Sequence, residues 1–259
     1  MNPEILIQNI IAIARKAGDA IMEIYATDFN VELKGDNSPL TAADKKSNEV
    51  IITELEKIYP DIPRISEETK LTPFEERKNW KRYWLIDPID GTIEFIKRNG
   101  EFTVNIALVE NGVTVLGVVY APAKQLMYYG DKVNGSFLQE GNLSPQKLKA
   151  GKNYNELTVV NVVASRSHMS DETVAFVDEL KKQGKEIEFI SSGSSLKFCL
   201  VAEGKADVYP RFGPTMEWDT AAGQAVIECA GGKVMQTDLI TPLKYNKENL
   251  LNPFFIVSW

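Results

Sequence analysis

The stretch of this sequence that decides the fold is Tyr83-Trp84-Leu85-Ile86-Asp87-Pro88-Ile89-Asp90-Gly91-Thr92. Its first four residues are apolar, which predicts the end of a buried strand. Two carboxylates follow, three residues apart. Pro88 lies between them and has no N–H to donate to a neighbouring strand, so we expect the strand to end there and the chain to turn. The turn would direct Asp87 and Asp90 into one space at the carboxyl end of the strand, with the Ile89 carbonyl beside them.

A short helix is predicted directly after this turn. Gly91 and Thr92 would open it, residues 93–98 would form it, and Asn99-Gly100 would close it. Free backbone N–H groups at the start of a helix suit a phosphate group. Carboxylates that face a phosphate need cations between them, and oxygen ligands favour Mg²⁺. We therefore hypothesise a magnesium-dependent site that acts on phosphate. The alternative for this motif by itself is an ordinary Asp-Pro-Xaa-Asp-Gly turn.

Composition narrows the class of protein. The chain has 259 residues, 44% hydrophobic and 25% charged, which is typical of a globular protein with a substantial core. Its net charge of −7 argues against polynucleotide binding. Two cysteines, Cys199 and Cys229, imply no disulfide framework. The sequence shows neither a signal-type segment nor an apolar run long enough for a membrane span. We expect a cytoplasmic protein and leave open a peripheral attachment to the cytoplasmic side of the inner membrane.

Residues 1–155 predict two helices followed by a mainly antiparallel sheet. Apolar residues recur at helical spacing over 4–26, and a second helix is expected to run from Thr41 to about Ile58. Asp44 lies three residues after Thr41, as in a capping box. Further elements are a short strand that ends at Glu67-Glu68, a hairpin over 102–120, and strands at 126–129 and 135–138.

Residues 156–259 show a different rhythm, in which strands and helices alternate. The predicted strands cover 157–160, 188–190, 206–210, 233–235 and 255–257, and the predicted helices cover 170–182, 194–204 and 218–230. Such alternation is typical of an α/β layer, so we predict one subdomain over 1–155 and a second over 156–259. Asp219 falls in the first turn of the last helix, whose small residues would let it approach another element closely.

Three motifs taken together resemble those of the inositol monophosphatase superfamily. They are Ser66-Glu67-Glu68, Trp84–Thr92 and Trp218-Asp219-Thr220-Ala221-Ala222-Gly223, and their order and separation match along essentially the whole chain. Within the superfamily, the chain most resembles the bacterial 3′(2′),5′-bisphosphate nucleotidases, on the stretches 95–108, 165–168, 193–204 and 209–214. The resemblance implies an α/β fold with an α+β N-terminal part, arranged as the layered α-β-α-β-α sandwich of the inositol monophosphatase and fructose-1,6-bisphosphatase type.

The resemblance also implies a role for each matching residue. Two or three Mg²⁺ ions would be bound by Glu67, Asp87, Asp90, Asp219 and the Ile89 carbonyl. Asp44 and Thr92 would orient and deprotonate the attacking water. The substrate would contact the N–H groups of Gly91 and Thr92, the metal-side residues Glu67, Ile89, Asp90 and Asp219, and, at its nucleotide end, His168, Ser194, Lys197 and Arg211.

Electrostatics supports two of these assignments independently. Four converging carboxylates would repel one another and lose hydration, so they imply bound cations. A substrate with two phosphate groups needs positive charge away from the metal, and Lys197 with Arg211 could supply it. The alternative for Lys197, Arg211 and His168 is a solvated surface position, since such side chains are commonly exposed.

We therefore expect Mg²⁺-dependent, Li⁺-sensitive hydrolysis of adenosine 3′,5′-bisphosphate to AMP and phosphate, with its sulfated relative PAPS as a second substrate. By family analogy this activity would be linked to sulfur assimilation. One alternative is an inositol-1-phosphate or fructose-1,6-bisphosphate phosphatase on the same scaffold. Another is a non-catalytic, metal-dependent nucleotide sensor. The expected partner is a small nucleotide bisphosphate, and both a monomer and a homodimer stay open.

Overall fold

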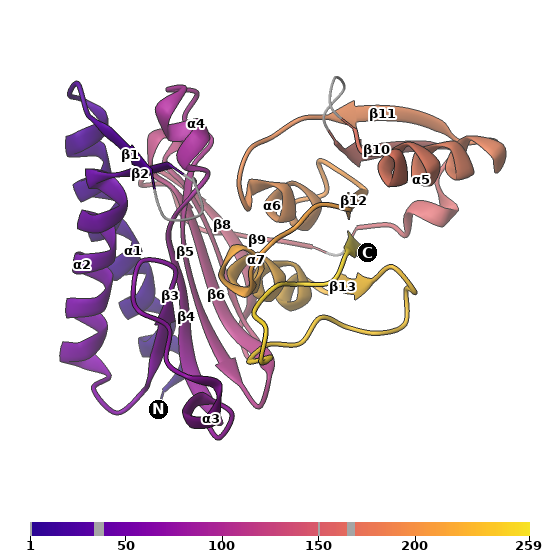
Figure 1. Ribbon diagram of the computed structural model, residues 1–259. Helices are drawn as coiled ribbons and strands as arrows, with labels where there is room; N and C mark the ends of the chain where they lie inside the picture. The colour runs from indigo at the N-terminus through magenta and orange to yellow at the C-terminus, as the bar shows by residue number, and fades with distance from the viewer. Residues whose placement is uncertain (1, 34–38, 150, 165–168) are drawn as a thin grey trace.

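The structure is a computed structural model that describes residues 2–33, 39–149, 151–164 and 169–259 (Figure 1). Within these ranges the elements form five layers: a helical pair, a seven-stranded sheet, a second helical pair, a five-stranded sheet and an outer helix. Three buried apolar clusters among the described residues fill the spaces between the layers. The predicted fold class, a layered α-β-α-β-α sandwich, is confirmed.

The first layer consists of α1 (Pro3–Tyr25) and α2 (Ala42–Ile58). Asn2 caps α1 by accepting from the N–H of Glu4, and Pro3 suits the first helical position because its missing N–H would have no partner there. α2 begins with the predicted capping box of Thr41 and Asp44. Both helices bury their apolar faces against the seven-stranded sheet. Between them, β1 (Val31–Leu33) and β2 (Pro39–Thr41) form a small antiparallel pair.

The seven-stranded sheet has the order β3-β4-β5-β6-β7-β8-β9. Its strands are β3 (Arg64–Ser66), β4 (Arg82–Asp90), β5 (Thr103–Glu110), β6 (Val113–Ala121), β7 (Leu126–Asp131), β8 (Gly135–Glu140) and β9 (Gln146–Lys147). β3 and β4 are parallel, and the other neighbours are antiparallel. The short helices α3 (Phe74–Arg77) and α4 (Thr92–Ile96) lie before and after β4, and the 3-10 turn η1 (Pro122–Lys124) follows β6.

The expected strand end at Pro88 is wrong. β4 continues through Pro88 to Asp90, and its pairing with β5 shifts register between Asp87 and Asp90. A register shift of this kind admits residues that do not pair with the neighbouring strand, so Pro88, which has no N–H to donate, fits inside it. In a regular strand, Asp87 and Asp90 would point to opposite faces of the sheet, because they are three residues apart. The register shift between them removes this constraint, so both can still point into one space.

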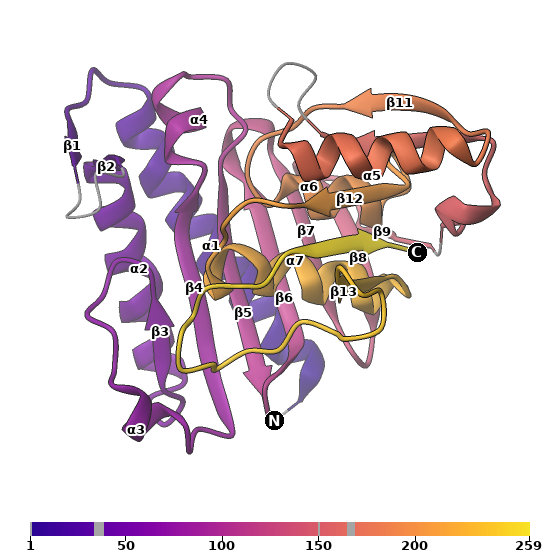
Figure 2. The same ribbon diagram turned by 45° about the vertical axis from the view of Figure 1, so that its right-hand side comes forward.

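The second helical pair, α6 (Leu196–Ala202) and α7 (Glu217–Ala230), lies between the two sheets. α7 runs across the face of the seven-stranded sheet opposite to α1 and α2 (Figure 2). A Cβ placed on Gly117 of β6 would come within 2.4 Å of the Ala222 carbonyl of α7, so only glycine permits this approach. As the sequence indicated, the small residues of α7 allow this helix to pack closely against another element, here β6.

The five-stranded sheet has the order β11-β10-β12-β14-β13. Its strands are β10 (Val159–Val163), β11 (Glu186–Ile190), β12 (Val208–Arg211), β13 (Lys233–Gln236) and β14 (Phe255–Ser258). α5 (Asp171–Lys182) covers its outer face, and the 3-10 turn η2 (Tyr154–Glu156) precedes β10. The chain passes from one sheet to the other between Lys147 and Val159; the subdomain boundary at 155 stays a prediction. None of the helices among the described residues combines the length and apolar character that crossing a bilayer requires.

Candidate active site

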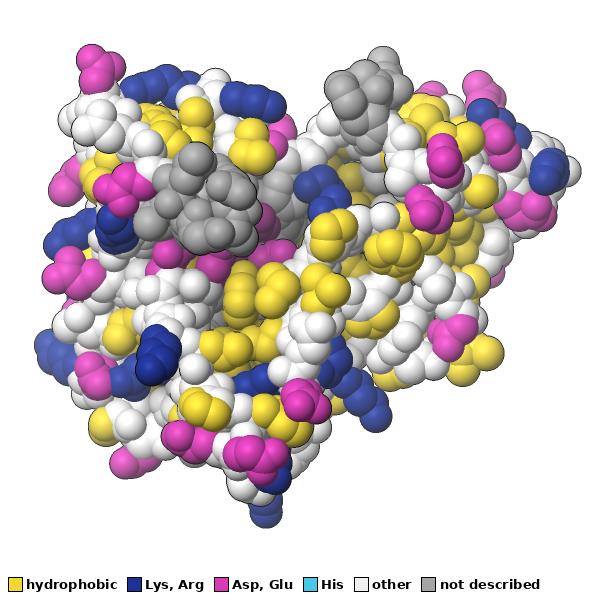
Figure 3. Space-filling model, in the orientation of Figure 1, with side chains coloured by type: hydrophobic (Ala, Val, Ile, Leu, Met, Phe, Trp, Pro, Cys, Tyr) yellow, Lys and Arg dark blue, Asp and Glu magenta, His cyan; other side chains and the backbone are white. Residues whose placement is uncertain are grey.

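Three of the predicted acidic ligands converge from three different elements. Glu67 directly follows β3, Asp87 lies on β4, and Asp219 lies in the first turn of α7. Each places one carboxylate oxygen within 4.8 Å of the others. Asp90, at the end of β4, lines the same cavity as Asp219. In Figure 3, acidic side chains gather in the recess between the two halves of the molecule, and basic side chains lie across it.

Local backbone geometry brings the first two ligands together. The parallel pairing of β3 with β4 places Ser66 opposite Ile86, and the N–H of Glu67 donates to the Ile86 carbonyl at 3.2 Å. Asp87 follows Ile86 directly, so the two acids lie side by side. Two further hydrogen bonds fix the irregular part of β4: the N–H of Ile89 donates to Asp87 Oδ1 at 3.1 Å, and Ser47 Oγ of α2 donates to the Pro88 carbonyl at 2.8 Å.

The cluster is electrostatically unfavourable without cations. Burial, followed by the charges of Glu67, Asp90 and Asp219, raises the pKa of Asp87 well above its ordinary value. Burial and the charge of Asp90 raise the pKa of Asp219 to about 8. Burial, opposed by the charge of Lys197, raises the pKa of Asp90 to about 6. The charge of Lys197 only partly offsets the effect of burial on Asp90. Converging carboxylates with raised pKa values are the oxygen donor set that a hard divalent cation requires, so these residues fit the predicted Mg²⁺.

Asp44 and Thr92 form the predicted pair. Asp44 is buried at the start of α2, where its Oδ2 accepts from the N–H and the hydroxyl of Thr41 at 2.7 and 2.6 Å. These bonds fix the carboxylate and leave Oδ1 to accept from Thr92 Oγ1 at 3.2 Å. The Ile89 carbonyl lies 3.4 Å from the same hydroxyl. The first residue of α4 is thereby connected both to α2 and to the irregular end of β4.

Gly91 lies where a side chain would not fit. Its φ of 90° is in the left-handed region, and a Cβ would lie 3.2 Å from both the Glu101 carbonyl and the Ser194 Cβ. The helix that it opens, α4, begins at Thr92 as expected, but it has only five residues and ends at Ile96, two residues earlier than expected. A helix of this length has only a small macrodipole, so its contribution to phosphate binding would come from its free backbone N–H groups.

Lys197 and Arg211 form a basic wall that two cavities share. The smaller cavity, about 160 Å³, also contains Asp90, Gly91 and Asp219. The larger, about 280 Å³, extends away from the acids towards β10 and α5. Burial lowers the pKa of Lys197, while the charge of Asp90 raises it. The Lys197 ammonium also donates to the Ser194 carbonyl at 3.1 Å, so the predicted residues Ser194, Lys197 and Arg211 all lie around one space with the acids.

The structure adds residues that the sequence did not reveal. Tyr209 lines both cavities, Glu94 and Thr215 line the smaller one, and Ser170, Thr173 and Phe212 line the larger one. His168 lies outside the described residues, although Ala164 and Met169, the nearest described residues on each side, line the larger cavity. These side chains come from elements far apart in sequence, so the folded chain is needed to show that they line one space.

A buried polar chain connects the two halves of the site. Ser195 Oγ donates to Asn105 Oδ1 at 2.8 Å and lies 2.8 Å from Thr103 Oγ1. Asn105 Nδ2 lies 3.5 Å from Asp90 Oδ2. Asn105 pairs with Asp87 across β4 and β5, so a prediction of that pairing would have located it. Nearby, the N–H of Gly193 donates to Glu101 Oε2 at 2.8 Å.

Comparisons with known proteins cover nearly the whole chain and agree with one another. A family model described as the inositol monophosphatase family matches residues 2–252. The Salmonella typhimurium protein named 3′(2′),5′-bisphosphate nucleotidase CysQ is 46% identical over 257 residues, which cover 98% of this chain and 99% of that one. The crystal structure of CysQ from Bacteroides thetaiotaomicron is similar with a TM-score of 0.86 and 44% identity, over 99% of this chain and 98% of that chain. An inositol monophosphatase from Thermotoga maritima gives a TM-score of 0.72 at 29% identity, over 96% of this chain and 89% of that chain.

Proposed function

This chain belongs to the inositol monophosphatase family, and we propose that it is a Mg²⁺-dependent 3′(2′),5′-bisphosphate nucleotidase that converts adenosine 3′,5′-bisphosphate to AMP and phosphate. The observation that carries the proposal is the shared cavity in which the acidic ligands Asp90 and Asp219 face the basic residues Lys197 and Arg211. Such a cavity suits a bisphosphate, because the phosphate to be hydrolysed would bind the metal ions at the acidic residues while the basic residues bind the other phosphate. The names of the similar nucleotidases support a nucleoside 3′(2′),5′-bisphosphate as the class of substrate.

The acidic wall holds the metal. Glu67, Asp87 and Asp219 supply converging carboxylate oxygens, and Asp90 and the Ile89 carbonyl extend the donor set from the irregular end of β4. Bound Mg²⁺ would stabilise charge on the phosphate and lower the pKa of a water molecule. The number of ions, two or three, is part of the proposal.

Asp44 and Thr92 together would accept the proton that the attacking water loses. The Thr92 hydroxyl would accept a hydrogen bond from the attacking water while it donates to Asp44 Oδ1. Because Asp44 Oδ2 is already bound twice to Thr41, the carboxylate cannot rotate freely and keeps Oδ1 towards Thr92. The pair is thus a fixed acceptor for the water proton.

The basic wall holds the second phosphate and the nucleoside. Arg211 and Lys197 would bind the 5′-phosphate with charge-assisted hydrogen bonds. The larger cavity, which begins at these residues and is lined by Phe212 and Tyr209, would receive the nucleoside. PAPS carries the same 3′-phosphate, so we extend the proposal to PAPS and, by family analogy, to sulfur assimilation.

Phosphate release from several substrates tests the proposal. Adenosine 3′,5′-bisphosphate, PAPS, fructose 1,6-bisphosphate and inositol 1-phosphate would be compared with Mg²⁺, with Mg²⁺ plus Li⁺, and with EDTA. We expect release that needs Mg²⁺, is inhibited by Li⁺ and favours the adenosine substrates. A preference for a sugar phosphate would contradict the substrate assignment. If the protein binds the nucleotide but releases phosphate from none of the substrates, the result would contradict an enzymatic function and favour the nucleotide sensor.

A further inference from the structure

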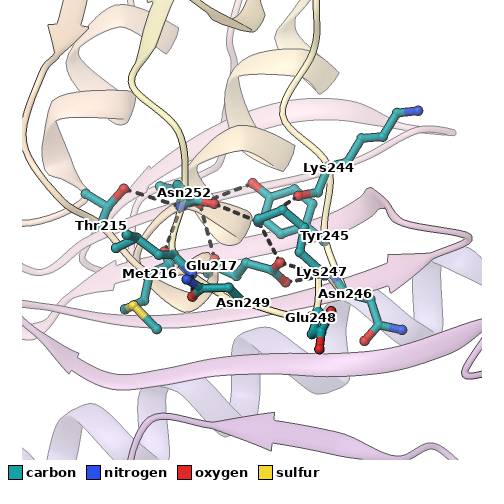
Figure 4. Close-up of polar contacts among 12 residues, drawn as sticks. Thr215, Met216, Glu217, Lys244, Tyr245, Asn246, Lys247, Glu248, Asn249 and Asn252 are labelled. Atoms are coloured by element: carbon teal, nitrogen blue, oxygen red, sulfur yellow. Dashed lines mark hydrogen bonds and ion pairs between the residues drawn. The ribbon is translucent and has the colours of Figure 1, made fainter. Parts of the chain in front are cut away.

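The first turn of α7, which carries Asp219, is held by the segment 244–252, here named loop 244–252 (Figure 4). The N–H of Glu217 donates to the Leu250 carbonyl at 2.9 Å. Asn252 Nδ2 donates to the Met216 carbonyl at 2.9 Å and lies 3.0 Å from Thr220 Oγ1. These bonds lie one to three residues away from Asp219 along the chain, so a displacement of the loop displaces this turn.

Glu217 forms the centre of this attachment. Its side chain has no solvent exposure, and its two carboxylate oxygens accept from the Asn246 N–H at 2.7 Å, the Lys247 N–H at 3.0 Å and the Lys247 ammonium at 2.6 Å. Lys247 Nζ also donates to the Lys244 carbonyl and lies 3.2 Å from Asn252 Oδ1. A buried carboxylate is stable only when charge and hydrogen bonds compensate it, and loop 244–252 supplies all three of these donors.

The same loop is attached to the first half of the molecule. Arg77, buried at the end of α3, donates to Asn246 Oδ1 at 2.9 Å and to the Glu248 carbonyl at 2.7 Å. Asn246 Nδ2 donates in return to the Arg77 carbonyl at 2.7 Å. The N–H of Tyr245 donates to the Gly112 carbonyl in the hairpin between β5 and β6. Loop 244–252 therefore connects α7 to segments that flank β3, β4 and β5.

We propose that Glu217 and Lys247 are positioning residues that set the distance between Asp219 and the ligands Glu67 and Asp87. The three ligands belong to separate elements, and loop 244–252 bridges the turn that carries Asp219 and the segments that flank the strand carrying Asp87. Mg²⁺ requires near-ideal octahedral geometry, so a small shift of this turn weakens binding. The inference rests on the proposed function in that it takes these carboxylates as the Mg²⁺ site.

The test is Mg²⁺ binding to the purified full chain by titration calorimetry. Glu217→Gln keeps the shape of the side chain but removes the charge that Lys247 and the loop N–H groups bind. We expect the dissociation constant for Mg²⁺ to rise about 10-fold or more, the usual cost of losing a partner that orients metal ligands. Turnover should return to within about threefold of the unsubstituted protein at saturating Mg²⁺, because the residue touches no substrate.

The matched control is Lys244→Gln. Lys244 belongs to the same loop and carries the same charge as Lys247, but its side chain is exposed and points away from the network (Figure 4). Its Mg²⁺ affinity should equal that of the unsubstituted protein. Asn252→Ala is a milder second variant, which deletes the side-chain bonds to the turn and the Oδ1 contact with Lys247 Nζ. It should weaken Mg²⁺ binding in the same direction. It serves as the test if Glu217→Gln does not fold.

Two failures can be told apart. Affinities within about twofold of the unsubstituted protein in folded Glu217→Gln and Asn252→Ala overturn the positioning role alone. An unsubstituted protein that binds no Mg²⁺ overturns the proposed function, and this inference with it. Equal weakening in the Lys244→Gln control would assign the effect to the charge of the loop and would also overturn the specific role of Glu217.

Discussion

The acidic wall and the basic wall of the cavity are built in different ways. The acidic wall is formed largely by one strand and its parallel neighbour, and backbone bonds fix the relative positions of Glu67 and Asp87. The basic wall consists of long side chains from α6 and β12, elements of the second half of the chain. Burial raises the pKa of Asp219 and lowers that of Lys197, so both walls disfavour their own charge. Under the proposed function, the rigid acidic wall would perform the chemistry and the basic wall would select the substrate.

The largest effect should follow from breaking the acidic wall. Asp90→Asn removes one negative charge from the donor set with little change of shape, and we expect turnover to fall by at least about 10³-fold, since metal stabilisation of the transition state contributes several kcal/mol. Far-UV circular dichroism should show an unchanged fold. Asp178→Asn, on the exposed face of α5, is the matched control and should retain full activity. Retained turnover in Asp90→Asn would refute its role as a ligand.

A smaller loss is expected when the acidic wall keeps its charges but loses the proton acceptor. Thr92→Val is nearly isosteric and deletes the hydroxyl that donates to Asp44. General-base contributions of this kind are worth about 10²-fold or more, so kcat should fall by about that factor while Mg²⁺ affinity stays within about twofold. Steady-state kinetics with a Mg²⁺ titration separates the two. A weakened Mg²⁺ affinity with normal kcat would place Thr92 in the metal site instead.

Breaking the basic wall should change selectivity. In Arg211→Ala, kcat/KM for adenosine 3′,5′-bisphosphate should fall by roughly 10- to 100-fold, the cost of a lost hydrogen bond to a charged group. The value for 3′-AMP, which lacks the second phosphate, should change little. Lys182→Ala, at an exposed position of α5, serves as the control. Equal losses on both substrates would mean that Arg211 acts on the reacting phosphate.

The smallest effect concerns the stability of the metal-free protein. Asp219 has a pKa of about 8 and Asp90 about 6 in the folded state, against an ordinary 3.8. Between pH 4 and pH 8 the folded state therefore binds more protons than the unfolded state, so stability falls as the pH rises. Thermal unfolding in EDTA should show a Tm at least about 3 °C lower at pH 8 than at pH 5. Added Mg²⁺ should remove this difference. A Tm that rises with pH would contradict the burial of these charges.

The acidic wall has a clearer local signal in the sequence than the basic one, for a physical reason. Glu67, Asp87 and Asp90 lie at the ends of apolar runs, where strand periodicity and turn chemistry locate them. The spacing of Thr41 and Asp44 indicated the capping box that the structure contains. The error at Pro88 arose because proline ends a regular ladder but fits inside an irregular one. The enzyme class and the family were predicted from the motifs and are supported by the comparisons.

Other residues could not be found without the fold. Tyr209 and Phe212 meet Ser170 only because β12 and α5 pack together on the second sheet. The attachment of Glu217 to Lys247 joins residues 30 apart in sequence. Neither the lining of the larger cavity nor the contact of Glu217 with Lys247 has a local sequence pattern, because both depend on how distant segments pack. The roles assigned to the individual site residues stay predictions until the variants are measured.

The most direct test of the account is to identify the product formed from adenosine 3′,5′-bisphosphate with Mg²⁺. Chromatography against authentic 5′-AMP and 3′-AMP distinguishes which phosphate reached the acidic wall. We expect 5′-AMP and one equivalent of phosphate, because the basic wall would hold the 5′-phosphate away from the metal site. Release of 3′-AMP would contradict the assignment of the two walls, and no release would contradict the proposed activity.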